Sequence, residues 1–227
     1  MKQAIDFSHN HQEFLNVGSR RKSINTFMFI VTKGCAFIRL GKDEFTVKAG
    51  HGFLIPIDCL HAITILPGTI YNKVEFSARL TSPICKEAGF FRKSPLVSVV
   101  LDELAKHYKR DGHVALAGTA GNLLRVLTDQ VTALKVHTKS TSPELAAKYQ
   151  PVLSKALKGD KVIDRAASDV LSQYTGYSMN ELQTCILMRE ALKLSRSGRK
   201  TDQIAETLNV DAELLAAMAR PILGQEL

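Results

Sequence analysis

The stretch Thr175–Val210 reads TGYSMNELQTCILMREALKLSRSGRKTDQIAETLNV, and it predicts one long helix followed by a compact helical unit. Ser178 stands three residues before Glu181, the spacing at which each side chain satisfies the other residue's backbone N–H at a helix start. Gly198 occupies the place of a left-handed C-terminal cap. Between them apolar residues recur at helical spacing, at Leu182, Cys185, Ile186, Met188 and Leu192. We therefore expect a helix of about five turns over residues 178–197.

Positive charge follows one side and the end of this predicted helix. The basic residues are Arg189, Lys193, Arg196, Arg199 and Lys200. A line of cations on a helix is typical of a surface that meets an acidic partner. We interpret these five residues, with Thr201 at the start of the next helix, as candidate contacts to the DNA backbone.

Residues 201–220 have the spacing of a helix-turn-helix. Counted from Thr201, such a unit has apolar residues at its fourth, eighth, tenth, fifteenth and eighteenth positions, a small residue at the fifth and a residue tolerant of positive φ at the ninth. Those positions are held by Ile204, Leu208, Val210, Leu215, Met218, Ala205 and Asn209. This arrangement lets two helices joined by a short turn share one core. The alternative is the last helical hairpin of an all-α domain.

This region resembles the DNA-binding domain of AraC/XylS-type bacterial transcription regulators. The resemblance rests on Gly176 and Ser178, on Ala191 in the long helix, and on Ile204-Ala205. It implies that residues 142–227 form a domain in which a linker helix, 178–197, joins two helix-turn-helix units, one at about 152–173 and one at 201–220. The chain departs from the family at several places: Leu187 replaces an arginine, Asn209 replaces a glycine, and the phenylalanines that normally follow the last helix are absent.

The first unit, 152–173, has the weaker pattern. An alignment on Gly176 puts Asp160 in a core position and displaces Gly159. Either this unit is degenerate or its register differs from the alignment. Arg165 and Ser168 are its candidate groove-facing residues.

The chain between about residues 25 and 76 has a different character. Short runs of β-branched and aromatic residues alternate with Gly, Pro and Asp turns every eight to twelve residues, which is typical of a sandwich or a barrel. The segment Gly50–His61 resembles the second cupin motif, with a glycine, a proline and a histidine at the motif's spacing. We therefore expect an α+β multidomain protein with a cupin-like β-barrel over residues 1–90 and an all-α helix-turn-helix domain at the C-terminus.

The barrel's metal ligands are missing. A cupin enzyme binds metal through histidines of its first motif, and the corresponding residues 34–49 contain none. His9 and His11 lie ahead of the barrel in what we expect to be an exposed arm. The sequence therefore predicts no enzyme, no metal and no cofactor.

The sequence leaves open whether the barrel binds a small-molecule effector. His61 either contacts such a ligand or closes the end of a strand. Arg39 either reaches an acidic ligand or faces solvent.

Residues 91–141 show helical periodicity over 95–108 and 120–136 and then a polar linker, Lys139–Pro143. In the resembling family such helices pair two subunits, so we expect a homodimer. The predicted contact residues are Leu123, Leu124, Leu127, Val131 and Leu134. The alternative is that these helices pack on their own barrel.

Charge and composition limit which classes of function the sequence allows. The formal charge of +8 favours a nucleic-acid partner, yet residues 142–227 carry 11 basic and 11 acidic side chains. No apolar run resembles a signal peptide or a membrane span, so we expect a cytoplasmic protein without membrane contact. The four cysteines lack the spacing of a metal or redox site and are expected to be free thiols.

Two functions remain. The first is a transcription regulator that binds double-stranded DNA, and the second is a divergent relative that binds DNA poorly and acts through mixed dimers or anti-activation. The second is favoured by the predicted last helix, whose exposed positions are Asp211, Ala212, Glu213, Ala216 and Ala217. Base-reading helices instead present Arg, Lys, Asn or Gln. Pro221 is expected to end this helix early.

Overall fold

The computed structural model describes residues 4–227. Its strands form two antiparallel sheets. The first sheet contains, in spatial order, β1 (Ile5–Gln12), β9 (Thr69–Phe76), β4 (Thr26–Lys33), β7 (Gly52–Ile55), β10 (Gly89–Phe91) and β11 (Val136–His137). The second contains β2 (Asn16–Val17), β8 (Leu60–Ile65), β5 (Cys35–Leu40) and β6 (Asp43–Lys48), with β3 (Arg21–Lys22) paired to β8.

The predicted cupin-like β-barrel is wrong. Within residues 4–227 the two sheets have separate strand orders, and no ladder of paired strands joins one sheet to the other. They pack face to face as an open sandwich around a core that includes Phe29, Ile38 and Phe53. Strand lengths and alternation are the same in a sandwich and a barrel, because closure depends on which edge strands pair. The expected N-terminal arm is also wrong, since residues 5–12 form β1 and His9 Nδ1 lies 2.7 Å from Asn72 Oδ1, whereas His11 is exposed as expected.

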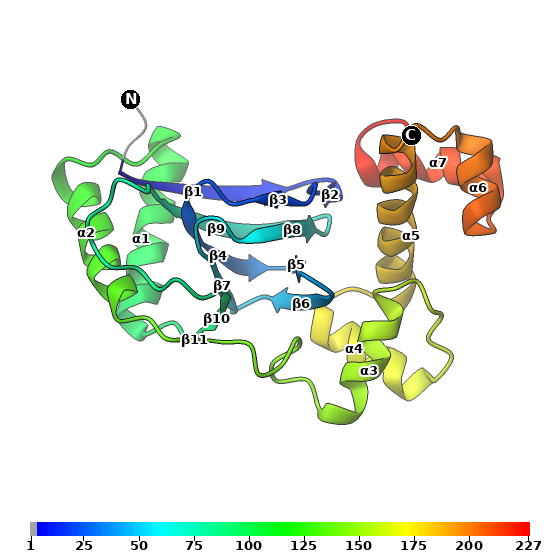
Figure 1. The fold of residues 1–227 in the computed structure, drawn as a ribbon, viewed down its shortest axis with the longest axis horizontal. Coiled ribbons are helices and arrows are strands. Elements are labelled where there is room, and N and C mark those ends of the chain that lie inside the picture. Colours follow the sequence, from blue (N-terminus) through cyan, green and yellow to red (C-terminus); the bar gives the residue numbers. More distant parts are fainter. Residues whose placement is uncertain (1–3) are drawn as a thin grey trace.

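The central strands are buried on both faces. In β4, Phe27 and Phe29 point between the sheets, whereas Met28 and Ile30 belong to the core under the helices α1 (Pro95–Asp111) and α2 (Gly118–Thr132). Successive side chains of a strand alternate between faces, so a continuous apolar run marks a strand covered on both sides. The molecule therefore has layers, with helices at each end of the sandwich (Figure 1).

The residues predicted for the dimer contact face the protein's own first sheet, which corrects that prediction. Leu124, Leu127 and Val131 are fully buried in the core that covers Phe7 and Met28. Leu123 and Leu134 are half-buried against the same core. The amphipathic pattern was correct, but the open sheet supplied the surface that buries it. A homodimer stays a prediction.

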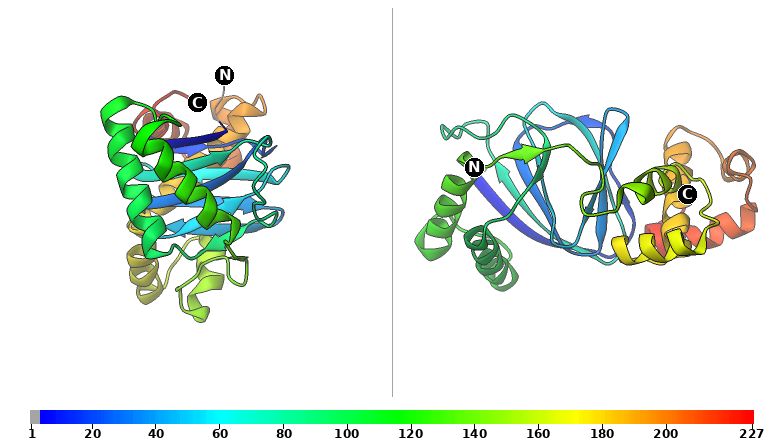
Figure 2. Two further views of the ribbon diagram at one scale, coloured as in Figure 1. Left: turned by 90° about the vertical axis from the view of Figure 1, so that its left-hand side faces the viewer. Right: turned by 90° about the horizontal axis from the view of Figure 1, so that it is seen from below.

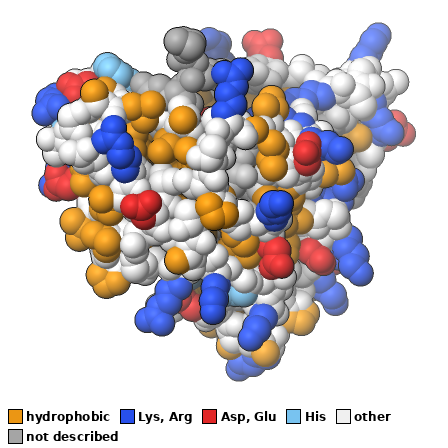
Figure 3. Space-filling model, turned by 60° about the vertical axis from the view of Figure 1, so that its left-hand side comes forward, with side chains coloured by type: hydrophobic (Ala, Val, Ile, Leu, Met, Phe, Trp, Pro, Cys, Tyr) orange, Lys and Arg blue, Asp and Glu red, His pale blue; other side chains and the backbone are white. Residues whose placement is uncertain are grey.

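A subunit contact through these helices would have to use their outer face. Apolar side chains are exposed there at Leu96, Val99 and Val126. Figure 3, which brings this side of the molecule forward, shows apolar side chains scattered among charged ones rather than gathered in one patch.

The C-terminal helices lie against the outer face of the second sheet (Figure 2). They are η1 (Ala147–Tyr149), α3 (Gln150–Ala156), α4 (Arg165–Thr175), α5 (Met179–Arg196), α6 (Thr201–Leu208) and α7 (Ala212–Leu223). Phe37 and Leu66 of the sandwich share one core with Leu182 and Leu192 of α5. None of the helices in the described part of the chain is long and apolar enough to cross a membrane.

The long helix and its start are confirmed. In α5 the Ser178 hydroxyl accepts from the backbone N–H of Glu181, and the Glu181 carboxylate accepts from the N–H of Ser178. The expected early end of the last helix is wrong, since α7 continues past Pro221 to Leu223. Pro221 lies in the last turn, where it removes one backbone hydrogen bond and has little helix after it to disrupt.

Candidate nucleic-acid interface

The first helical unit, residues 147–175, carries an exposed basic surface. We define the basic surface as Lys148, Lys155, Lys158, Lys161 and Arg165. All five are exposed, and within residues 4–227 none of them forms an ion pair with a carboxylate. Exposed cations outside ion pairs remain available to phosphate groups, although Lys148 Nζ also lies 4.8 Å from the centre of the Tyr149 ring.

This unit does not have the short turn of a helix-turn-helix. Residues 157–164 separate α3 from α4, an eight-residue connection. Asp164 caps α4 by accepting from the backbone N–H of Ala166 at 2.9 Å. Arg165 is exposed at the first position of α4 and Ser168 is half-buried one turn later. The predicted groove-facing role of both residues stays a prediction.

The four lysines of the basic surface were missed from the sequence. Lys155, Lys158 and Lys161 recur every third residue, but the helix-turn-helix alignment treated this segment only as core positions and a turn. Their spacing was a usable signal, since a basic cluster marks a nucleic-acid contact without requiring a motif.

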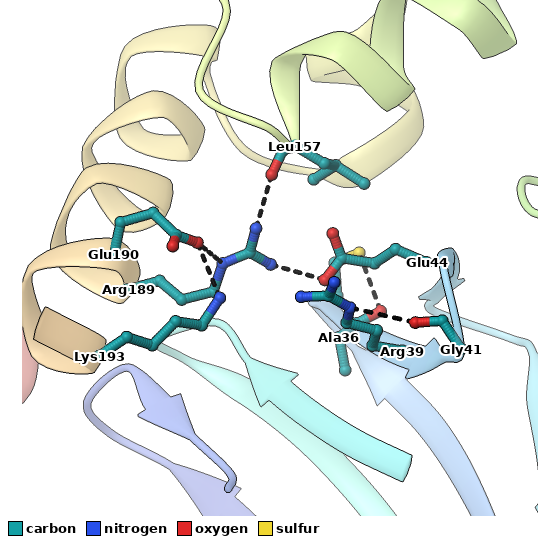
Figure 4. Close-up of polar contacts among 9 residues, drawn as sticks. Ala36, Arg39, Gly41, Glu44, Leu157, Arg189, Glu190 and Lys193 are labelled. Carbon is teal, nitrogen blue, oxygen red and sulfur yellow. Dashed lines mark hydrogen bonds and ion pairs between the residues drawn. The ribbon is translucent and has the colours of Figure 1, made fainter. Parts of the chain in front are cut away.

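Arg189, a predicted DNA contact, is engaged inside the protein. Its side chain is buried between α5, α3 and the β5–β6 hairpin (Figure 4). Nη1 donates to Glu44 Oε1 at 2.6 Å and Nη2 donates to the carbonyl of Leu157 at 2.6 Å. In this conformation it is not presented to a DNA backbone. Its role as a phosphate contact requires α5 to separate from the sandwich.

The same arginine also binds its neighbour on α5. Arg189 Nε and Lys193 Nζ both donate to Glu190 Oε1, at 3.1 and 2.8 Å. Burial opposes ionisation of Glu190, but these two cations outweigh it and lower the pKa of that carboxyl. The linker helix is therefore held against the sandwich by a network of charged hydrogen bonds.

The remaining predicted cations occupy the end of α5. Arg196 Nη1 donates to the carbonyl of Val17 in the sandwich at 2.6 Å. Arg199 Nη1 donates to Thr207 Oγ1 at 2.9 Å, and Lys200 is the exposed N-cap residue of α6. Thr201 is half-buried. The structure therefore brings Arg199 and Lys200 together at the surface and ties Arg189 and Arg196 to the sandwich.

The second helical unit has the expected turn. α6 and α7 are joined by three residues, 209–211, and Asn209 adopts φ 52°. Leu215 and Ala219 of α7 are buried with Ile204 of α6, so the two helices share one core. The exposed side of α7 carries Glu213, Leu214, Ala216, Ala217, Arg220 and Pro221. This face has one cation, Arg220 in the last turn, and no amide side chain, so it presents few of the groups that read base edges.

The two predicted ligand-binding residues do not share a face. In the β5–β8 register Arg39 pairs with Ala62 and Leu40 with His61, so adjacent positions place the Arg39 and His61 side chains on opposite sides of the sheet. His61 is buried, and its Nδ1 lies 3.0 Å from the carbonyl of Cys59. Burial lowers the pKa of His61, and the nearby Arg21 and Lys73 lower it further. One ligand cannot contact both residues.

Arg39 lines a cleft between the sandwich and the C-terminal helices. The cleft has a volume of about 410 Å³. Lys42, Lys158, Arg189 and Lys193 also line it, opposed by three carboxylates. Such a lining suits a small anion. Within residues 4–227 no group of three His, Cys, Asp or Glu side chains is arranged to hold a metal ion.

The linker after β11 is also fixed to the sandwich. Glu144 binds Lys48 Nζ at 2.8 Å and His51 Nε2 at 3.3 Å. These hydrogen bonds, from Lys48 first, lower the pKa of Glu144. The backbone N–H of Thr46 donates to the carbonyl of Thr141 at 2.8 Å.

No protein-family model matches this chain, and no curated protein matches it. Among solved structures, the chain is similar to an apo form of a ToxT variant from Vibrio cholerae strain SCE256, with 10% identity over 99% of this chain and 96% of that one and a TM-score of 0.43. It is also similar to ToxT from Vibrio cholerae O395, with 14% identity over 99% and 96% of the two chains and a TM-score of 0.40. A cupin superfamily protein from Desulfitobacterium hafniense DCB-2 is 13% identical over 34% of this chain and 71% of that chain, with a TM-score of 0.31. At these TM-scores the function has to be argued from the chain's own residues.

Proposed function

We propose that this protein is a DNA-binding transcription regulator that contacts the phosphate backbone chiefly through the basic surface of its first helical unit. The observation that carries the proposal is the set of five exposed cations outside ion pairs on η1, α3, the following connection and the start of α4. The two helical units stand at opposite ends of α5 (Figure 1), so one rigid helix connects them. We treat the protein as a binding protein and not as an enzyme.

The sandwich has a regulatory role in this proposal. Arg189 and Arg196 hold α5 against the sandwich through Glu44 and the carbonyl of Val17. A small anionic effector in the 410 Å³ cleft would compete with Glu44 for the cations there and would change how the helices sit on the sandwich. Effector binding would thereby alter the position of the basic surface.

A second function is favoured by one observation. The exposed side of α7 is mainly apolar and has only Glu213 and Arg220 as charged groups, whereas a recognition helix presents several polar and basic groups. This supports a divergent regulator that binds DNA poorly and acts through protein–protein contacts. DNA affinity separates the two functions.

The test is a salt titration of binding to arbitrary duplex DNA. We expect the logarithm of the binding constant to fall steeply with the logarithm of salt concentration, since each phosphate contact adds about −0.9 to the slope. The variant Lys155→Glu/Lys158→Glu/Lys161→Glu should lose this binding. Absence of binding by the wild-type protein at low salt would leave only the second function.

A matched variant controls for overall charge. Arg20, Arg21 and Lys22 are three exposed cations on and beside β3 of the sandwich. Reversing them to glutamate changes the net charge by the same amount as the lysine variant. We expect this control to retain most of the affinity, and equal losses in the two variants would contradict a localised DNA contact.

A further inference from the structure

The exposed face of α7 has a symmetric arrangement of charged and apolar side chains about Ala217, so it can pair with the same face of a second α7 helix. Seven residues span almost two helical turns, so Glu213 and Arg220 lie on one flank of the face, and Leu214 and Pro221 lie on the other. Ala217 lies midway between the members of each pair. Leu214 is 54% exposed, a large value for a leucine in a folded unit.

The charges of this face have no partners in the same chain. Neither Glu213 nor Arg220 forms an ion pair within residues 4–227. They cannot bind each other, since seven residues of helix separate their backbones by about 10 Å along the axis. A second helix is needed to bring a carboxylate to Arg220 and a guanidinium to Glu213.

We propose that α7 is a self-association surface that binds α7 of a second copy of this chain. Two α7 helices related by a two-fold axis at Ala217 run antiparallel, and residues on the same flank then meet. Glu213 of each copy lies opposite Arg220 of the other, and Leu214 lies opposite Pro221. Ala216 and Ala217 leave room at the centre for the helix axes to approach to about 8 Å.

A second copy is the partner that this pattern fits. The two-fold axis makes the same surface serve both sides of the contact, as isologous interfaces require. The face meets its own image with two ion pairs and two apolar contacts. One 12-residue helix buries less than the about 800 Å² per partner of a standard interface, so the dimer is weak in solution.

This surface is separate from the predicted contact through α1 and α2 and from the proposed DNA contact. It assigns the second unit to pairing two chains, while the first unit holds DNA. Two weakly paired chains on neighbouring DNA sites would bind more tightly than either alone, since the second contact becomes intramolecular.

The experiment is sedimentation velocity of the full chain without DNA from about 1 to about 200 μM, a range suited to a small interface. We expect a concentration-dependent dimer. Glu213→Arg and Arg220→Glu should each weaken it about tenfold or more, because like charges then face each other. The double variant Glu213→Arg/Arg220→Glu should restore it, since the charges are exchanged and the pairing is kept.

Glu206→Arg is the matched control, since it reverses an exposed carboxylate on α6 of the same unit. It should leave the dimer unchanged, and Ala217→Arg should abolish the dimer. Circular dichroism of each variant establishes that the helices are retained, as expected for exposed positions. A monomer at every concentration, single reversals without effect, or a double variant that fails to recover would each overturn the proposal.

DNA binding by the same variants distinguishes a groove-facing α7. A helix facing phosphates would bind DNA more tightly after Glu213→Arg and more weakly after Arg220→Glu. Self-association instead predicts that both single variants change the DNA affinity in the same direction, because both weaken the dimer. Opposite effects on affinity for an isolated single site would contradict the assignment of this face to a second copy.

Discussion

The two helical units at the ends of α5 divide between them the features of a DNA-binding motif. The first unit, 147–175, carries five basic and three acidic residues, but its helices are joined by eight residues. The second unit, 201–223, has the three-residue turn, but it carries four acidic residues and one basic residue. The short turn and the positive charge of a DNA-binding motif therefore occur in different units of this protein. A helix-turn-helix scaffold needs only a shared core, whereas binding phosphate needs exposed cations.

The largest expected effect comes from removing the core of each unit in turn. Leu171 of α4 and Leu215 of α7 are both fully buried, so either Leu→Ala change should lower the free energy of unfolding by about 3 kcal/mol. If the units divide the work as we propose, Leu171→Ala should weaken DNA binding far more than Leu215→Ala at a temperature where both proteins are folded. Urea denaturation and binding to duplex DNA measure the two effects. Equal losses of DNA affinity would break the comparison.

Arg189 tests whether the first unit depends on the sandwich. Arg189→Met removes one partner of a buried ion pair and leaves Glu44 and the carbonyl of Leu157 without their donor. We expect the free energy of unfolding to fall by about 2 kcal/mol, because Glu44 keeps some access to solvent.

The control for that change is the double variant Arg189→Met/Glu44→Leu. Thermal denaturation measures the stability of the single and double variants. The double variant should recover part of the loss, since no buried charge is left unpaired. A double variant less stable than either single variant would argue against direct coupling of these two side chains.

A smaller effect is the loss of stability at mildly acidic pH. Burial lowers the pKa of His51 and of His61 below the ordinary histidine value of 6.5. In the folded protein these rings bind protons only at lower pH than in the unfolded chain. As the pH falls through 6.5 the unfolded state therefore gains protons first, and the free energy of unfolding decreases.

The measurement is urea denaturation between about pH 7.5 and about pH 5.5, the range of histidine titration. His51→Gln and His61→Gln should each flatten the decrease. His51 also lies beside Glu144, Lys48 and Lys93, which oppose one another in setting its pKa. A decrease as steep in both variants as in the wild type would contradict this assignment.

The smallest effect concerns the turn of the second unit. Asn209 adopts a left-handed conformation that glycine accepts more readily, and its side chain is exposed. Asn209→Gly should increase the free energy of unfolding by about 0.5 kcal/mol and so raise the melting temperature slightly. Thermal denaturation monitored by circular dichroism measures it. A clear decrease would mean that the Asn209 side chain contributes a contact of its own.

Short sequence patterns predicted correctly those features that depend only on residues close together in the chain. Ser178 and Glu181 predicted the start of α5 because a capping box is made within four residues, and Asn209 marked the short turn for the same reason. The apolar stripe of α2 was also predicted correctly. The surface that it covers was not, because any sheet face or second subunit satisfies the same periodicity.

The candidate site was predictable only in part. Arg199 and Lys200 are at the surface as expected, whereas Arg189 was read as a DNA contact and is buried against Glu44, which lies 145 residues earlier. No local pattern reveals such a partner. The lysines at 155, 158 and 161 were visible in the sequence, but only the folded chain shows that they are exposed and outside ion pairs.

The sequence by itself determined the strands between residues 25 and 76, the amphipathic helices, the capping box of α5 and the separation of basic from acidic helical units, because these follow from local hydrogen bonding, periodicity and charge. It did not predict β1 or the end of α7. Only the tertiary structure decided that the sheets stay open, that α1 and α2 cover the first sheet and that Arg189 bridges α5 to the sandwich. Those outcomes depend on which distant surfaces meet, and burial rewards any complementary pairing regardless of its separation along the chain.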